Sequence, residues 1–160
     1  MKKLRAITLF AFVVLLSSCG NNVEKARIAY DKGVNLMYNS NRFAEAEEQF
    51  SIAIKYDKNN YEAYYYRGCS KFNRAMYDEA IVDFEKALEV KPNYADAEFN
   101  LGMIYFLKND YDMSCYYYKC AQLHGRPNME DYVKACPDES KPFSVGALKF
   151  SLLISSPSSL

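Results

Sequence analysis

The middle of this chain contains an internal repeat with a period of 34 residues, which limits the folds open to it. Written in steps of that length, the middle of the chain brings large aromatic and small side chains into shared columns. The columns are Phe43, Tyr77 and Tyr111; Ala46, Ala80 and Ser114; Phe50, Phe84 and Tyr118; and Ala53, Ala87 and Ala121. Gly68 and Gly102 keep the period, and Gly33 is one residue out of step. Such a period indicates stacked units that bury their apolar faces against one another.

Each copy of the repeat has helical periodicity. In the second copy the apolar side chains recur at steps of three and four: Tyr77, Ala80, Ile81, Phe84, Ala87 and Leu88. This spacing predicts a helix with one apolar face, and it places Asp78, Glu79, Asp83 and Glu85 outside. An earlier helix contains Tyr64 and Gly68, and Pro92 ends the later one because its ring and missing N–H interrupt a helix. Gly68 and Ala80 are small where the two helices are expected to cross.

These residues resemble the tetratricopeptide repeat (TPR), whose pattern is W-x-x-L-G-x-x-Y, A-x-x-x-F and P. The matching residues are Tyr64, Gly68, Tyr77, Ala80, Phe84, Ala87 and Pro92 in copy two; Leu101, Gly102, Tyr105, Tyr111, Tyr118 and Ala121 in copy three; and Tyr30, Gly33, Phe43, Ala46, Phe50 and Ala53 in copy one. Copy three departs at Ser114 and Arg126. The resemblance implies an all-α array of about three helix-turn-helix repeats in a short right-handed superhelix. A C-terminal capping helix is expected in Asn128–Cys136, with Asn128 as its N-cap.

The N-terminus has the features of an export signal. Lys2, Lys3 and Arg5 precede an apolar run, Leu9–Leu16, that is too short to span a bilayer. The following "LLSSC" resembles the bacterial lipobox, which implies cleavage before Cys19 and attachment of lipid, including palmitate, to that residue. An ordinary signal peptide with an incidental cysteine is the alternative. The resemblance implies a lipoprotein of the bacterial cell envelope, and Gly20 in place of Asp favours the outer membrane, facing the periplasm.

Four segments follow from these patterns. We expect a lipoprotein signal peptide at 1–18, a lipidated linker at 19–24, a TPR domain with its capping helix at 25–136, and a flexible tail at 137–160. The repeat register is lost from Pro137 onward. The apolar run Ala147–Ile154 leaves open a strand, or a segment that lies across the repeats.

The composition argues against most kinds of chemistry. Twenty Lys and Arg residues balance twenty Asp and Glu residues, and no basic run is present, so nucleic-acid binding is not expected. His124 is the one histidine and has no partner at metal-ligand spacing. The chain has neither a phosphate-binding glycine loop nor a G-x-S-x-G motif. We therefore expect no enzyme activity, no cofactor and no metal, and we place the carboxylates on solvated helix faces.

Four cysteines remain besides Cys19, in a compartment expected to be oxidising. A thioredoxin-like role is not expected because no C-x-x-C is present. The midpoint between Cys115 and Cys136 falls within the turn "GRPN", whereas the midpoint between Cys120 and Cys136 falls at the far edge of that turn. Bacterial TPR lipoproteins often carry a cysteine near the start of the last repeat helix and another that closes the domain, which implies a Cys115–Cys136 disulfide. Buried free thiols are the alternative.

The TPR resemblance also implies a concave groove lined by the first helix of each repeat. The residues expected to contact a partner there are Tyr30, Val34, Met37, Tyr38, Tyr65, Phe72, Phe99, Met103 and Phe106. Such an apolar surface usually marks an interaction site, although some of these side chains belong to the core in the alternative interpretation. In "YYYRGC", Tyr64 is expected in the core, Tyr65 in the groove and Tyr66 half-buried. In the second triplet only Tyr118 is expected in the core.

The function expected from this groove is a non-enzymatic, lipid-anchored scaffold that binds a peptide or protein segment of the cell envelope. The identity of that partner and the oligomeric state are left open. Acidic C-terminal peptides are not expected, because Tyr30, Tyr65 and Phe99 replace the Lys and Asn of a carboxylate clamp. The alternative is a carbohydrate-binding accessory lipoprotein of a glycan uptake system, in which the aromatic rings stack on sugars.

Overall fold

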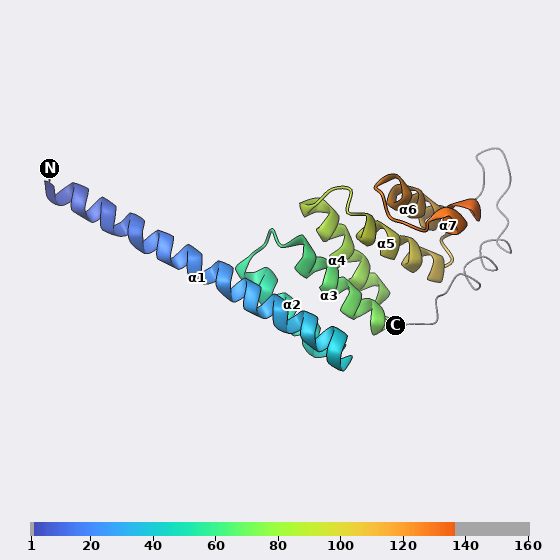
Figure 1. Cartoon of the computed structure of the whole chain (residues 1–160), viewed down its shortest axis with the longest axis horizontal. Coiled ribbons are helices and arrows are strands. Elements are labelled where there is room, and N and C mark those ends of the chain that lie inside the picture. Colours follow the sequence, from blue (N-terminus) through green and yellow to red (C-terminus); the bar gives the residue numbers. More distant parts are fainter. Residues whose placement is uncertain (1, 137–160) are drawn as a thin grey trace. The chain divides into compact units, whose positions relative to one another are not determined.

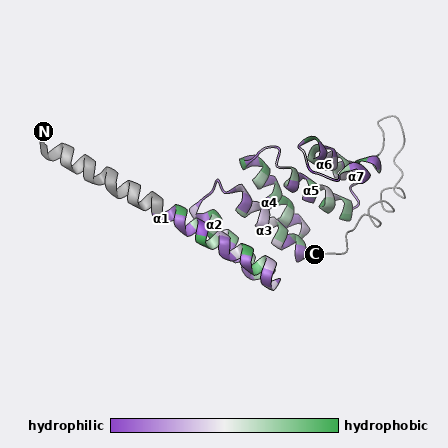
Figure 2. Ribbon diagram, in the orientation of Figure 1, coloured by the Kyte–Doolittle hydropathy of each residue, from purple (hydrophilic) through white to green (hydrophobic). Residues whose placement is uncertain are grey.

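The computed structural model describes the backbone of residues 2–136 and the side chains of residues 21–136. Within this part the chain forms helices without any strand, which confirms the all-α prediction and the helix-turn-helix array (Figure 1). The helices are α1 (Lys2–Ser40), α2 (Phe43–Tyr56), α3 (Tyr61–Asn73), α4 (Tyr77–Val90), α5 (Ala95–Leu107), α6 (Tyr111–Leu123) and α7 (Glu130–Lys134). Both hydrophobic and hydrophilic residues are found on the coloured helices in Figure 2.

The chain divides into two compact units, and each is described by itself below. The first extends to Ala80 and the second begins at Ile81, inside α4. The backbone of residues 19–24 is helical as part of α1, and the expected tail, 137–160, lies outside the described residues. Among the described residues, no helix has the length and apolarity needed to cross a membrane.

The columns of the 34-residue repeat coincide with the most buried positions of the chain. The fully buried residues in three of these columns are Ala46, Ala80 and Ser114; Phe50, Phe84 and Tyr118; and Ala53, Ala87 and Ala121. The remaining column, which opens the second helix of each repeat, is half-buried. A large ring therefore alternates with small residues along the buried face of each of these helices. This alternation lets helices approach closely without leaving voids.

In the first unit, α2 packs against α1 and α3, and Figure 1 shows α1 and α2 side by side. One core cluster is formed by Leu36, Met37, Ala46 and Phe50. A Cβ atom on Gly33 would lie 2.7 Å from the Phe50 ring, so only glycine allows this crossing of α1 and α2. A second cluster, of Ala29, Ala53 and Ala63, has small residues alone and brings α1, α2 and α3 together.

In the second unit, α6 packs between α5 and α7. Tyr118, Ala121 and Met129 form the buried cluster at the α6–α7 contact. Of the second tyrosine triplet, Tyr118 is fully buried, Tyr117 is half-buried and stacks on Tyr105, and Tyr116 is exposed. The core position predicted for Tyr118 is therefore confirmed.

Side-chain hydrogen bonds cap the first turns of α3 and α6, and residues with positive φ angles lie between helices. The Asn60 side chain accepts a hydrogen bond from the Ala63 N–H at the start of α3, and Asp110 accepts one from the Met113 N–H at the start of α6. Positive φ angles, which bend the chain between helices, occur at Asn41, Ala75, Asn93, Asn109 and Asn128. Asparagine is the residue besides glycine that best tolerates this conformation.

Two predictions about these helices are wrong. Asn128 is not an N-cap: its φ is 58°, Met129 holds the cap position, and α7 covers only Glu130–Lys134. Asp83, placed on the solvated face of α4, is 1% exposed. Periodicity identified the faces of α4, but a residue at the border of the apolar stripe is buried or exposed according to its neighbours in space.

Candidate functional site

The first unit carries a group of aromatic side chains that we call the tyrosine cluster: Tyr30 and Tyr38 from α1, and Tyr65 and Tyr66 from α3. Tyr66 is its centre. Its ring centroid lies 5.9 Å from that of Tyr30, 6.2 Å from that of Tyr38 and 5.1 Å from that of Tyr65. Beneath the cluster, the Tyr66 ring stacks on Phe50 of the core at 5.8 Å. The cluster is therefore fixed to a rigid base.

The hydroxyl groups of the cluster are linked. Besides burial, interaction with the Tyr66 hydroxyl raises the pKa of Tyr30, and interaction with the Tyr38 hydroxyl raises that of Tyr66. Burial is the main reason that the pKa of Tyr66 rises to about 12, and burial also raises the pKa of Tyr30 well above its ordinary value. The negative charge of Glu62 acts in the same direction on both. The cluster thus presents neutral rings, hydroxyl groups and one nearby carboxylate.

The residues predicted to bind a partner have different exposures in the first unit. Tyr38 is 62% exposed, Tyr65 is half-buried, and Phe72 is half-buried with its ring 5.8 Å from that of Tyr77. Tyr30 and Val34 are half-buried and pack against the Phe50 core cluster. The accessible part of the predicted surface in this unit therefore centres on Tyr38 and Tyr65.

The prediction that Met37 contacts a partner is wrong. Its side chain is buried at 7% exposure, belongs to the core cluster, and accepts a 3.7 Å contact from the Ser70 hydroxyl at its sulfur. It therefore has no surface to offer a partner. Conversely, Tyr66 was not among the predicted partner contacts, although it organises the cluster. Its importance depends on which residues of α1 face α3, and no pattern within α3 could have revealed it.

In the second unit Phe99 is half-buried, and three neighbouring side chains contact its ring. The Arg126 guanidinium lies 3.8 Å from its ring centroid, and the rings of Tyr132 and Tyr118 lie at 5.2 and 5.7 Å. Arg126 is in turn ion-paired with Asp96 of α5. Cation–π contact and ring packing together tie α5 to the end of α6 and to α7. Phe99 thus contributes to the packing of this unit.

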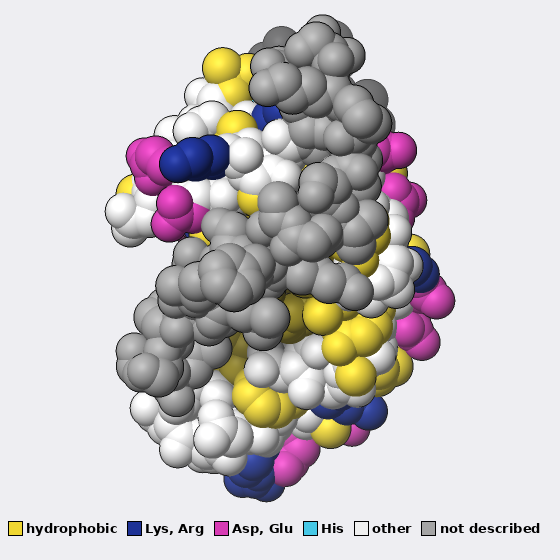
Figure 3. Space-filling view, turned by 90° about the vertical axis from the view of Figure 1, so that its right-hand side faces the viewer, with side chains coloured by type: hydrophobic (Ala, Val, Ile, Leu, Met, Phe, Trp, Pro, Cys, Tyr) yellow, Lys and Arg dark blue, Asp and Glu magenta, His cyan; other side chains and the backbone are white. Residues whose placement is uncertain are grey.

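The other two predicted contacts of the second unit are half-buried. Met103 packs against the same buried cluster as Phe99, and Phe106 makes an edge contact with Tyr111 at 5.7 Å. On the face of the molecule drawn in Figure 3, hydrophobic side chains reach the surface among charged ones. Of all the predicted partner contacts, only Tyr38 of the first unit is exposed rather than half-buried or buried.

His124 has a structural role. Its Nδ1 lies 2.7 and 2.8 Å from the two carboxylate oxygens of Glu98, which is buried at 6% exposure. Glu98 is thus a second exception to the prediction that the carboxylates are solvated. A buried carboxylate needs such a partner, because burying an unpaired charge is costly.

Nothing in the described residues points to catalysis or metal binding. They contain no group of three His, Cys, Asp or Glu side chains that could hold a metal ion. Cys120 is a free thiol, and burial raises its pKa, so it stays protonated near neutral pH and is a poor nucleophile. Cys69 likewise forms no disulfide.

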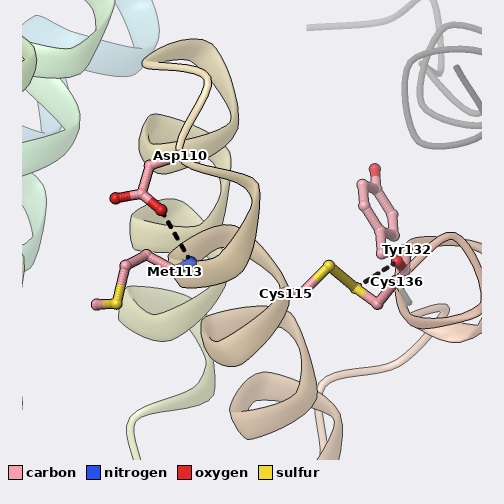
Figure 4. Close-up of a disulfide and its surroundings, with 5 residues drawn as sticks. All are labelled: Asp110, Met113, Cys115, Tyr132 and Cys136. Carbon is pink, nitrogen blue, oxygen red and sulfur yellow. Dashed lines mark hydrogen bonds between the residues drawn. A yellow bond between two sulfur atoms is a disulfide. The ribbon is translucent and has the colours of Figure 1, made fainter. Parts of the chain in front are cut away.

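A disulfide joins Cys115 of α6 to Cys136, the pair that the TPR lipoprotein resemblance implied. Their Cα atoms are 5.5 Å apart, within the usual range for a disulfide. Figure 4 shows the bond between α6 and the chain just after α7, with Cys136 Sγ 3.4 Å from the Tyr132 carbonyl oxygen. The bond fixes the end of the described chain to α6.

Comparison with known proteins identifies the repeats. Two family models, both described as tetratricopeptide repeat, match residues 61–94 and 30–70. Hsp70-Hsp90 organizing protein 3 of Arabidopsis thaliana is 28% identical over 120 residues, which are 74% of this chain and 21% of that protein. The chain therefore spans about a fifth of the length of that curated relative.

Solved structures agree on the fold. The second TPR of Spaghetti (RPAP3), bound to the HSP90 peptide SRMEEVD, matches with a TM-score of 0.63 and 18% identity, covering 67% of this chain and 97% of that one. YrrB, described as a TPR protein with an unusual peptide-binding site, matches with a TM-score of 0.61 and 25% identity, covering 66% of this chain and 54% of that one. Residues 30–94 are thus tetratricopeptide repeats in both sequence and structure.

Proposed function

We propose that this chain of tetratricopeptide repeats is a non-enzymatic interaction scaffold that binds a peptide or protein segment through its tyrosine cluster. The observation that carries the proposal is the placement of exposed Tyr38 and half-buried Tyr65 on a rigid base of Tyr66 and Phe50. Tyrosines bury a large area at a small entropy cost, and their hydroxyl groups can also hydrogen-bond a peptide backbone. Peptide binding by the repeats of RPAP3 and YrrB supports the same class of function.

The chemistry of the cluster favours a neutral or basic ligand with apolar side chains. Tyr30 and Tyr65 occupy positions where a carboxylate clamp would need Lys and Asn. Glu62 adds a negative charge close to the Tyr30 and Tyr66 hydroxyl groups. An acidic peptide such as SRMEEVD would be repelled by that charge and would find no cation among these side chains.

Ring geometry weighs against the alternative of a carbohydrate-binding accessory lipoprotein. Tyr66 meets Tyr30, Tyr38 and Tyr65 at interplanar angles of 60°, 78° and 69°. Rings tilted in this way give no flat platform on which a sugar ring could stack. The same arrangement leaves ring edges and faces between which a side chain of a peptide fits.

The test is a peptide selection against the purified protein, followed by titration of the selected peptides. A Tyr38→Ala, Tyr65→Ala double variant should weaken binding by at least about tenfold, since central aromatic contacts of an interface commonly contribute 2 kcal/mol or more. Tyr116→Ala removes a similarly exposed tyrosine from α6 and serves as the matched control, with affinity expected to stay unchanged. Equal affinity of the double variant and the wild type, both folded by circular dichroism, would exclude the tyrosine cluster as the binding site.

The scaffold is further proposed to be a lipoprotein of the bacterial cell envelope, anchored through lipid on Cys19 in the outer membrane and facing the periplasm. The basic start, the short apolar run and "LLSSC" support this assignment. Several acyl chains on one residue would anchor the protein stably, because each buried methylene adds about 0.8 kcal/mol. The partner is then another protein of the envelope.

A further inference from the structure

Helix α6 exposes two large hydrophobic side chains on one face. Tyr116 is 58% exposed and Leu123 is 81% exposed. They are seven residues apart, so two helical turns place them on the same side, with half-buried Cys120 between them. We call these three residues the outer stripe. Helix α7 packs against the Tyr118 and Ala121 face of α6 and leaves the outer stripe exposed.

An apolar outer face is unusual at the end of a repeat array, because terminal repeats normally present a polar face to water. The outer stripe also lies beside an anchoring point. Cys115 immediately precedes Tyr116, and its disulfide brings Cys136 to a Cα–Cα distance of 5.5 Å. The described chain therefore ends, at Cys136, beside the residue that precedes the outer stripe.

The sequence beyond this point supplies a matching segment. Leu148, Phe150 and Leu152 alternate with Lys149 and Ser151 in the apolar run 147–154. Ten residues separate Cys136 from this run and span up to about 35 Å when extended. The outer stripe is only about 10 Å long, from the helical rise over seven residues. The run can therefore reach any part of the stripe.

We propose that residues 147–154 of this chain dock on the outer stripe of α6, with the Cys115–Cys136 disulfide holding the start of the tail beside it. A short tether keeps a segment at an effective concentration of about 1 mM, so weak apolar contacts suffice. A second copy of the chain fits less well as the occupant. Three side chains offer far less than the roughly 800 Å² per partner that a stable dimer interface buries.

Hydroxyl-radical footprinting of the full oxidised chain tests this docking. A segment held at about 1 mM with a Kd of about 0.2 mM is docked about five-sixths of the time. Labelling of Tyr116 and Leu123 should then rise by up to about sixfold in a Phe150→Asp, Leu152→Asp variant. A Ser155→Asp, Ser158→Asp variant adds the same charge to the tail and should label like the wild type. Labelling of Tyr38, in the other unit, is expected to be equal in all three proteins.

Equal labelling of the outer stripe in the wild type and the Phe150→Asp, Leu152→Asp variant would overturn the proposal. So would protection that disappears on dilution, because it would identify a second copy as the occupant. A photo-crosslinking residue in place of Leu123 gives an independent measurement in the unaltered tail. The expected product joins position 123 to residues 147–154 of the same chain, and a product joined to another chain contradicts the docking.

Discussion

Two glycines show what a single side chain decides in this molecule. A Cβ atom on Gly102 would lie 2.6 Å from ring carbons of Tyr118 and 3.3 Å from the Ser114 carbonyl oxygen. Gly33 has the same relation to Phe50 in the first repeat. Both rings are fully buried and cannot move aside without opening the core. Each glycine is thus required by a neighbouring helix and not by its own backbone.

Gly102→Ala is expected to destabilise the protein by about 1–3 kcal/mol, the usual cost of overpacking a core. The direction of this change in the free energy of unfolding is informative, because Gly→Ala in a helix interior otherwise stabilises a protein by about 1 kcal/mol. Urea unfolding followed by circular dichroism measures the difference. Lys119→Ala, at an exposed position of the neighbouring helix, is the control and should change stability by less than about 0.5 kcal/mol. An unfolding free energy that increases in Gly102→Ala would contradict the close approach of α5 and α6.

The tyrosine cluster gives the first unit a pH dependence in the alkaline range. Burial raises the pKa of Tyr66 to about 12, whereas an unfolded tyrosine titrates near pH 10. The folded state therefore holds the proton more tightly, and this part of the stability is complete below about pH 10 and is lost as the pH rises toward 12. In a Tyr66→Phe variant the hydroxyl group that titrates at this position is absent. The unfolding free energy of this variant should decline less steeply between about pH 10 and 12 than that of the wild type. Parallel declines in urea unfolding would show that Tyr66 is not the group responsible.

At the scale of elements, α7 depends on its surroundings. It has five residues, far fewer than an isolated helix needs to be stable in water. Tyr132 and Val133 attach it to the buried cluster of α6, and the disulfide closes the loop between Cys115 and Cys136, 21 positions apart. The disulfide and the packing of Tyr132 and Val133 thus provide the stability that α7 lacks by itself.

Removing the disulfide with the substitutions Cys115→Ser and Cys136→Ser should lower the free energy of unfolding by about 3 kcal/mol, the chain-entropy value for a loop of this size. Hydrogen exchange should rise most at the amides of α7. Cys69→Ser, Cys120→Ser replaces two described cysteines that form no disulfide and serves as the matched control. If hydrogen exchange of the α7 amides is unchanged in the Cys115→Ser, Cys136→Ser variant, packing alone holds this helix in place.

At the scale of the whole molecule, one repeat supports two kinds of surface. The buried columns of the two units contain the same types of residue, a large ring between small side chains. Their surfaces differ: the first unit exposes part of the tyrosine cluster, whereas in the second Arg126 and Tyr132 contact the ring of Phe99. The scaffold therefore constrains function little, and the partner is selected by residues that the repeat leaves free.

The proposed anchoring also concerns the whole molecule. Cys19→Ser should abolish incorporation of labelled palmitate and move the chain from the membrane fraction to the soluble fraction, because the serine hydroxyl cannot replace the acylated thiol. Cells are labelled with palmitate and separated into membrane and soluble fractions, and gel electrophoresis of each fraction then shows both the label and the location of the chain. Cys69→Ser keeps the lipobox and should behave like the wild type. Palmitate label retained by Cys19→Ser would exclude this residue as the lipid site.

The pattern of residues along the chain was enough to predict the repeat register, the helical pairs of the repeats and the fully buried columns from Ala46 to Ala121. It could do so because a 34-residue period combined with helical spacing specifies which face of each helix is buried, whatever lies opposite. The resemblance to TPR lipoproteins also pointed to Cys115 and Cys136, which the structure joins. These features depend on the pattern of residue types along the chain.

Packing between helices decides which side chains near the border of each apolar stripe are accessible, and the sequence pattern did not predict it. The tertiary structure buried Met37 and Glu98, brought neighbouring side chains against the ring of Phe99, and made Tyr66 the centre of the tyrosine cluster. It also moved the start of α7 from Asn128 to the residues after Met129. The physical reason is common to these cases. The burial of a border residue is decided by the side chains of a neighbouring helix, and those neighbours are set by packing between elements and not by the residue's own position in the repeat.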